Sequence, residues 1–141
     1  MYNKILVPLA LDQGHGLRSM ALARRLVTEN GKIIAVHVID PIPSFAKYYM
    51  ASENQQGIQQ SVKDAIAERI GLDNDAEAVV LTGQPGRAIT DYANKIGADC
   101  IIVGPHRPGL TDFFLGSTAA RVVRFAKCSV HVLRESDPSG S

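Results

Sequence analysis

The sequence has little net charge, few cysteines and no long apolar run. Its 141 residues include 15 lysines and arginines against 14 aspartates and glutamates, which leaves a formal net charge of +1. This balance provides no overall positive field for nucleic acid or for an anionic membrane, so we expect neither as a partner. Apolar stretches such as residues 5–11 are far too short to span a bilayer. Residues 1–4 lead into a strand-like segment without a small-residue cleavage site, so we also expect no signal peptide.

Cysteine and histidine are too sparse to predict a metal site. Cys100 and Cys128 lie in no CxxC motif and have no neighbouring histidines at zinc spacing. We expect both to pack as small apolar residues in a reduced, cytoplasmic protein. The four histidines are scattered along the chain, at His15, His37, His106 and His131. We expect His37 to be packed and hydrogen-bonded within a strand, and His106 alone to be placed for ligand contact.

Hydrophobic periodicity alternates between two types. Continuous apolar or β-branched runs predict strands at residues 4–10, 33–39, 77–82, 100–104 and 129–134. Apolar residues at helical spacing predict helices between these strands. The first helix follows Leu17, Met20, Ala21 and Val27, and we expect it to end at Gly31. Residues 44–57 fit either a long loop or a short helix.

This order of elements predicts the fold class. Apolar strands separated by helices are typical of a parallel sheet that is covered on both faces. With right-handed crossovers, the prediction is an α/β protein with a single-domain, doubly wound, five-stranded parallel sheet flanked by helices. We expect the domain to cover residues 1–135 and residues 136–141 to form a disordered tail. Ligands of such sheets bind beyond the carboxyl ends of the strands, where the winding direction changes.

The richest candidate segment covers residues 104–118. It follows the fourth strand and ends in a Gly-Ser-Thr triplet, residues 116–118, where we expect Ser117 to be the N-cap of the last helix. The first N–H groups of a helix have no partner within it and lie at the positive end of its dipole, so a phosphate binds well there. His106 and Arg107 would add charge-assisted contacts. An ordinary connection to a capped helix accounts for the same residues.

Two glycine patterns match nucleotide motifs only in part. Residues 104–109 have the glycine spacing of a P-loop, but Leu110 occupies the place of the required lysine. Residues 14–19 begin like a dinucleotide-binding motif, but Ser19 replaces its last glycine. We therefore favour neither of these two sites.

Several segments together resemble the universal stress protein family. The resemblance covers residues 2–134 and rests on Ile-Leu-Val-Pro at 5–8, Val-His-Val-Ile-Asp at 36–40, Gly-Gln-Pro at 83–85 and, most specifically, the stretch 116–130. The loop around His106 and Arg107 is similar to that of the small F and G types. The resemblance implies a Rossmann-like, adenine-nucleotide alpha-hydrolase-like fold. It also implies a cytoplasmic stress-response regulatory protein that binds ATP or a related adenine nucleotide, with or without Mg²⁺.

The resemblance implies a set of nucleotide-binding residues at one edge of the sheet. They are Pro8, Leu9, Ala10, Val38, Val103, Gly104, His106, Arg107, Gly116, Ser117 and Thr118. The first three would border the adenine and the ribose, and the backbone of Val38 would meet the adenine edge. Val103 and Gly104 would line the floor of the site. His106 and Arg107 would approach the phosphates, which the last three residues would cradle. Asp12 would help to hold a metal ion that is bound with the nucleotide.

Two departures from the family's ATP-binding pattern support an alternative. Arg107 replaces the second glycine of the pattern, and Ala10 stands where nucleotide-binding relatives usually carry an aspartate. The alternative is a dimeric protein-interaction module of the same family that has lost nucleotide binding. In either case the resemblance implies a homodimer through the last strand, from Ser129 to Arg134, because an exposed strand edge readily pairs with a second chain.

No arrangement of residues predicts catalysis. No serine follows the nucleophile-elbow pattern, and no side chain is identified as a general base. We therefore name no catalytic residue. A weak ATPase activity or an autophosphorylation at Ser117 or Thr118 stays open as a further possibility.

Overall fold

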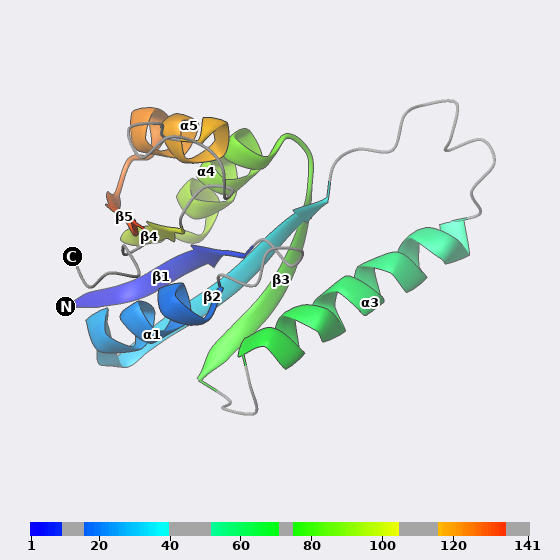
Figure 1. Ribbon diagram of the computed structural model, residues 1–141, viewed down its shortest axis with the longest axis horizontal. Helices are drawn as coiled ribbons and strands as arrows, with labels where there is room; N and C mark the ends of the chain where they lie inside the picture. Colours follow the sequence, from blue (N-terminus) through cyan, green and yellow to red (C-terminus); the bar gives the residue numbers. More distant parts are fainter. Residues whose placement is uncertain (10–15, 40–51, 71–74, 105–115, 135–141) are drawn as a thin grey trace, which may run out of the picture.

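The computed structural model describes residues 1–9, 16–39, 52–70, 75–104 and 116–134 (Figure 1). Strands and helices alternate along these stretches. In chain order they are β1 (Tyr2–Pro8), α1 (Gly16–Leu26), β2 (Val27–Ile39), α3 (Ser52–Ile70), β3 (Ala76–Thr82), α4 (Pro85–Ile96), β4 (Cys100–Val103), α5 (Ser117–Phe125) and β5 (Ser129–Val132). This alternation is the one that the hydrophobic periodicity predicts.

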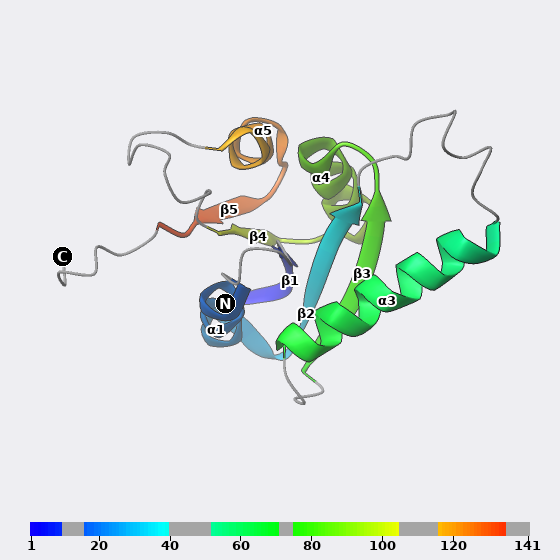
Figure 2. The same cartoon turned by 45° about the vertical axis from the view of Figure 1, so that its right-hand side comes forward.

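The strands form one parallel sheet in the order β3-β2-β1-β4-β5. The chain winds outward from β1 to β3 and then crosses to β4, on the other side of β1. The winding direction therefore changes between β1 and β4. Figure 2 shows α1 and α3 on one face of the sheet and α4 and α5 on the other. The predicted doubly wound, five-stranded parallel sheet is confirmed.

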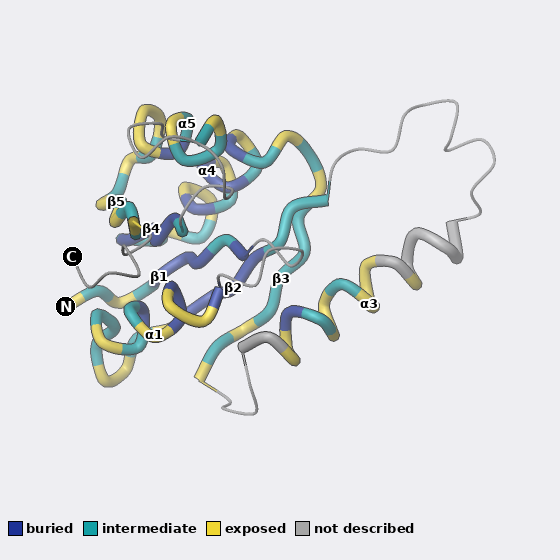
Figure 3. Tube along the Cα trace, viewed as in Figure 1, coloured by how far each residue is buried: buried dark blue, intermediate teal, exposed yellow. Residues whose placement is uncertain are grey.

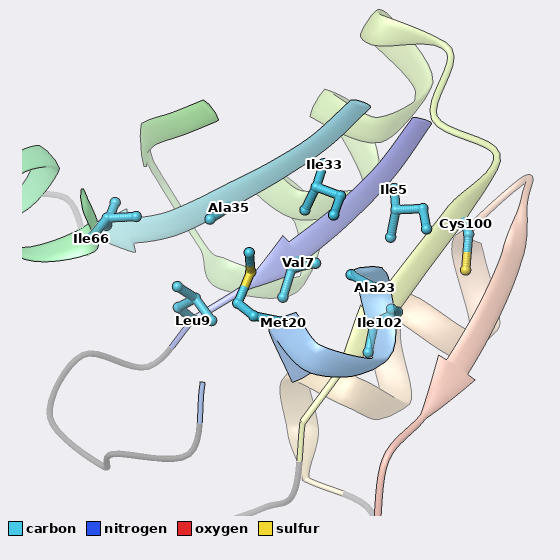
Figure 4. Packing of buried hydrophobic residues seen from close by; sticks show 10 residues of the cluster. All are labelled: Ile5, Val7, Leu9, Met20, Ala23, Ile33, Ala35, Ile66, Cys100 and Ile102. Carbon is cyan, nitrogen blue, oxygen red and sulfur yellow. The ribbon is translucent and has the colours of Figure 1, made fainter. Parts of the chain in front are cut away.

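Each face of the sheet buries its own apolar layer. Successive side chains of β1 point to opposite faces, so Ile5 and Val7 pack with Met20 of α1, whereas Leu6 packs in the layer that contains Val122 of α5. All five of these side chains are fully buried. Figure 3 shows the burial concentrated in the central strands, and Figure 4 shows the layer on the α1 side. Burial on both faces explains why the central strands are continuously apolar.

One predicted boundary is wrong, because α1 ends at Leu26 and not at Gly31. The β-branched Val27 begins β2 directly, and Gly31 lies inside that strand. The register there is irregular, since β2 advances five residues between its pairings with Tyr2 and Lys4. A Cβ atom on Gly31 would lie 2.5 Å from a methyl group of Val27. This glycine therefore permits a close approach within the bulged strand and does not cap the helix.

The predicted start of the second strand is wrong as well, because β2 begins at Val27 and not at residue 33. The remaining predicted boundaries lie close to the observed ones. Gly97 ends α4 in the left-handed conformation, with φ of 72°, as expected of a C-cap glycine. Helix α3 begins at Ser52, so residues 52–57 are helical and the remainder of the ambiguous stretch lies outside the described residues. The tail predicted at residues 136–141 also lies outside them. Among the helices that the structure describes, none is long and apolar enough to cross a membrane.

Candidate functional site

The pairing of β1 with β4 stops before either strand ends. Its registered pairs are Ile5 with Cys100 and Leu6 with Ile101, and both strands then continue for two more residues. The Leu9 N–H donates to β2, so the backbone of the preceding residue, Pro8, points toward β4. Because proline has no N–H, Pro8 cannot continue the ladder. The last two residues of β1 and of β4 therefore have no registered pairs with each other, at the point where the winding direction changes.

On the other side of β1, a side chain replaces the next backbone contact. The Leu9 N–H donates to the Val36 carbonyl at 2.7 Å, and the Leu9 carbonyl lies 2.8 Å from Nδ1 of His37. A carbonyl only accepts, so Nδ1 carries the proton and donates it. The prediction that His37 is packed and hydrogen-bonded is confirmed. Val38 lies two residues after Val36, so its backbone N–H and C=O also point toward the β1 side of β2.

The end of β4 contributes two residues with different roles. Val103 is buried, and its carbonyl accepts the N–H of Leu133 at 2.8 Å, so this carbonyl is already used on the β5 side. The backbone of the next residue, Gly104, points toward β1. A Cβ atom on Gly104 would lie 3.3 Å from Oγ of the buried Ser19. The absence of a side chain therefore lets the end of β4 lie close to α1.

Ser19 was not among the predicted site residues. It is 1% exposed and lies on the same buried face of α1 as Met20 and Ala23. The available signal was a serine between apolar residues on the inner face of the first helix. Its closeness to Gly104 depends on the packing of α1 against β4, and a single sequence does not display that contact.

The predicted N-cap of α5 is wrong by one residue. Gly116 occupies the cap position, with φ −55° and ψ 155°, and its carbonyl accepts the N–H of Ala120 at 2.8 Å. Ser117 is the first helical residue, one position after the cap, and its side chain is exposed. Thr118 is half-buried. The cap residue is a glycine and has no side chain to bond the first N–H groups of this helix, which are groups of the kind that bind an anion.

Helix α4 begins at the same edge of the sheet in a similar way. Its N-cap residue, Gln84, makes no side-chain capping hydrogen bond, and Pro85 follows it in the first turn. The preceding Gly83 has φ of 141°, a conformation that favours glycine, and its N–H donates to the Ile39 carbonyl at 3.0 Å. The carboxyl edge therefore contains the starts of two helices whose own N-cap residues make no side-chain capping bond.

Four of the predicted ligand residues lie outside the described residues. These are Ala10, Asp12, His106 and Arg107. The described residues bring together the ends of β1 and β4, the Val38 backbone and the start of α5 at one edge of a doubly wound sheet. No group of three or more potential metal ligands occurs among the residues that the structure describes.

The cysteines pack as predicted, and neither thiol is activated as a nucleophile. Both are free thiols, with Cys100 buried and Cys128 half-buried. Burial raises the pKa of the Cys100 thiol to about 11, with smaller contributions from the nearby Cys128 and Asp99. The pKa of Cys128 is raised too, again chiefly by burial. Both thiols therefore stay protonated at neutral pH, which disfavours nucleophilic chemistry.

The fold defines the class of the protein, a doubly wound α/β protein whose topological switch point lies between β1 and β4, the place where sheets of this class generally bind ligands. The model of the universal stress protein family matches residues 1–134. The chain belongs to this family, as its motifs predicted.

Individual relatives agree with the family match. A universal stress protein of Thermus aquaticus is 30% identical over 139 residues, covering 95% of this chain and all of the relative. Universal stress protein G of Salmonella typhimurium is 24% identical over 142 residues, with 95% and 100% coverage. A solved universal stress protein in complex with cAMP is 25% identical, with a TM-score of 0.62 and coverage of 96% of this chain and 98% of the other.

Proposed function

We propose that this protein binds an adenine nucleotide at the carboxyl edge of its sheet and acts as a regulatory module in the stress response. The observation that carries the proposal is the early end of the β1–β4 ladder at Pro8, at the same edge of the sheet as the start of α5, whose cap residue is a glycine. Unpaired backbone groups at this place suit the polar edge of a base, and the first turn of α5 suits a phosphate.

The proposed site uses the residues that the family resemblance implies. Pro8 and Leu9 border the adenine and the ribose, and the backbone of Val38 meets the adenine edge. Val103, through its side chain, and Gly104 form the floor. We extend the site to Ala10, His106, Arg107 and Asp12, with the basic pair at the phosphates and Asp12 at a metal ion that accompanies them. Gly116, Ser117 and Thr118 cradle the phosphates through their N–H groups and hydroxyls.

The class of ligand is supported by more than the shape of the edge. A solved member of the family was crystallised with cAMP, which shares its adenine with AMP and ATP. We propose ATP, with Mg²⁺ held between its phosphates and the protein, as the ligand of this chain. Arg107 is its phosphate ligand in this proposal, because a guanidinium forms paired hydrogen bonds with phosphate oxygens.

The proposal is tested by calorimetric titration and melting curves with MgATP, AMP, cAMP and MgGTP. A ligand that binds only the folded state raises the melting temperature. We expect a rise of several degrees with MgATP at about 100 times its Kd, a smaller rise with Arg107→Ala and none with MgGTP. No binding of any adenine nucleotide at millimolar concentration would refute the proposal.

We also propose that the protein is a cytoplasmic homodimer that pairs through β5. Within the described residues β5 pairs only with β4, so its other edge is free. The Leu133 N–H donates to Val103, so the N–H of Val132 points to that free edge. The exposed Phe125, with Arg121 and Arg124 near its ring, ends α5 close by. This edge also supports the alternative function, a dimeric interaction module without a nucleotide.

The dimer is tested by light scattering during gel filtration. Val132→Pro removes an N–H from the free edge without removing one that faces β4, so we expect a monomer. His131→Ala leaves every backbone N–H in place, and we expect it to stay dimeric. A monomeric wild-type protein would refute the dimer without bearing on nucleotide binding. A dimer that captures a protein partner and gains no stability from nucleotide would instead favour the alternative function.

A further inference from the structure

Leu9 is held at three points just where the chain leaves the sheet. Its side chain is 4% exposed and lies in the same apolar cluster as Val7 and Met20 (Figure 4). Its N–H donates to Val36, and its carbonyl accepts from Nδ1 of His37 at 2.8 Å. The last of these bonds is unusual, because a regular parallel ladder gives that carbonyl to a backbone N–H of β2.

The backbone donor that His37 replaces is that of Val38. The Leu9 N–H bonds to Val36, so continued pairing would bring the Leu9 carbonyl to the N–H two residues further along β2. Within the described residues the registered β1–β2 pairs end at Pro8 and Val36, and the Leu9 carbonyl is bonded to the imidazole instead. The polar groups of Val38 therefore still face the β1 side, without Leu9 as a partner.

We propose that His37 is a positioning residue of the ligand site, which keeps the Val38 backbone open for the edge of the adenine ring. By donating to the Leu9 carbonyl, the imidazole takes the acceptor that would otherwise close onto the Val38 N–H. The adenine edge offers an acceptor at N1 and a donor at N6, which match one backbone N–H and one C=O. This role rests on the proposed adenine-nucleotide function, but the bond between His37 and Leu9 is present without a ligand.

Three variants separate this role from simple packing. His37→Asn places an amide N–H near the position of Nδ1, so it can still donate to the Leu9 carbonyl. His37→Gln places its amide near the position of Nε2 instead, and His37→Leu has no donor. We expect the asparagine variant alone to behave like the wild-type protein. Circular dichroism and melting curves confirm that each variant is folded before it is compared.

The first measurement is hydrogen exchange at the Val38 amide in the ligand-free protein. In His37→Leu and His37→Gln the freed Leu9 carbonyl pairs with the Val38 N–H, so exchange of this amide slows. In His37→Asn it stays as fast as in the wild-type protein. A general loss of stability would accelerate exchange, so slower exchange is a result that damage to the fold does not produce.

The second measurement compares AMP with inosine monophosphate by calorimetry. Inosine monophosphate has a donor at N1 and an acceptor at O6, so it does not match the Val38 backbone. We expect His37→Leu and His37→Gln to weaken AMP by about three- to tenfold, the range of one hydrogen bond, and to leave inosine monophosphate unchanged. His37→Asn should retain the wild-type ratio of the two affinities.

The possible failures are distinguishable. A wild-type protein that binds no adenine nucleotide refutes the proposed function, while Val38 exchange still tests the contact that His37 controls. Unchanged Val38 exchange in His37→Leu overturns the role of His37. An unchanged affinity ratio in a protein that binds AMP overturns it as well, as does equal behaviour of the asparagine and glutamine variants.

Discussion

The two ends of the sheet are built differently. At the amino end, side chains bind the backbone: the Asp99 carboxylate accepts the N–H groups of Asn3 at 2.8 Å and Lys4 at 2.9 Å, and the Lys4 ammonium donates to the Ile96 carbonyl at 2.7 Å. At the carboxyl end the β1–β4 ladder stops at Leu6, and neither N-cap residue, Gln84 of α4 or Gly116 of α5, makes a side-chain cap. The side-chain bond described there, from His37 to the Leu9 carbonyl, takes the place of a backbone pair between β1 and β2. Under the proposed function, this difference leads us to expect that substitutions at the amino end change stability and that substitutions at the carboxyl end change ligand affinity.

The largest effect is expected where Asp99 ties β1 to β4. Its replacement by alanine leaves the N–H groups of Asn3 and Lys4 without their carboxylate, which should lower the free energy of unfolding by about 2 kcal/mol. Urea denaturation measures this loss. Asp91→Ala is the matched control, because the contact of its carboxylate with Arg87, at 3.8 Å, is exposed to solvent, and its loss should change stability by less than about 0.5 kcal/mol.

If the two ends of the sheet have separate roles, Asp99→Ala should lower stability and leave the affinity for nucleotide unchanged. Asp99 is at the end of the sheet opposite the proposed site, so the affinity of Asp99→Ala for AMP should match that of the wild-type protein at a temperature where both are folded. A substantially weaker affinity would show that the two ends of the sheet are coupled and do not have separate roles.

The second prediction compares one glycine at each end of the sheet. Substitution at the carboxyl end should mainly change nucleotide affinity, and substitution at the amino end should mainly change stability. Gly104→Val adds bulk at the floor of the proposed site, beside Ser19, and should weaken nucleotide binding by about tenfold or more at a modest cost in stability. Gly97→Ala at the other end forces a left-handed residue, φ 72°, and should cost about 1 kcal/mol of stability without changing affinity. Calorimetric titration gives the affinity of each variant, and urea denaturation gives its free energy of unfolding. The same effect on affinity in both would contradict the comparison.

The third prediction concerns pH and the buried thiol at the start of β4. The pKa of Cys100 is raised from 9.0 to about 11 in the folded protein, chiefly by burial, so the folded state holds this proton more tightly than the unfolded state. The resulting stability is fully present below pH 9 and is lost as pH rises from 9 through about 11. Cys100→Ala should therefore lose less stability over that range than the wild-type protein does. Equal losses in urea denaturation would show that the thiol does not contribute.

Much of the fold follows from local patterns in the sequence. Continuous apolar runs identify the central strands because both of their faces are buried, and Gly97 ends α4 as its position indicates. The end of α1 was missed because it depends on a contact across strands. Gly31 fits a bulge against Asn3 and Val27, and this contact outweighs the usual association of glycine with a helix end.

The sequence predicts where in the fold a ligand site would lie, but not the contacts that form this edge of the sheet. The order of strands and helices indicates the carboxyl edge, and the Gly-Ser pair indicates the start of α5. Its cap was placed one residue late, since Gly116 and Ser117 are both common N-cap residues and only the backbone distinguishes them. The bond from His37 to Leu9 joins residues 28 apart and requires the exact ending of the β1–β2 ladder. No spacing rule predicts such a contact.

A smaller effect than that of Asp99→Ala is expected at the surface ion pair of the amino end. Nε of Arg24 on α1 lies 2.7 Å from an Asp75 oxygen just before β3, with both side chains about a third or more exposed to solvent. Solvent screens such a pair, so Asp75→Ala should lower the free energy of unfolding by less than about 1 kcal/mol, and this loss should shrink in about 1 M salt. The loss in Asp99→Ala should persist in the same salt, because it comes from backbone N–H groups left unbonded. Urea denaturation of both variants at low and high salt measures the difference. If Asp75→Ala cost as much as Asp99→Ala, the amino end would be held by charge and not by the hydrogen bonds between Asp99 and the β1 backbone.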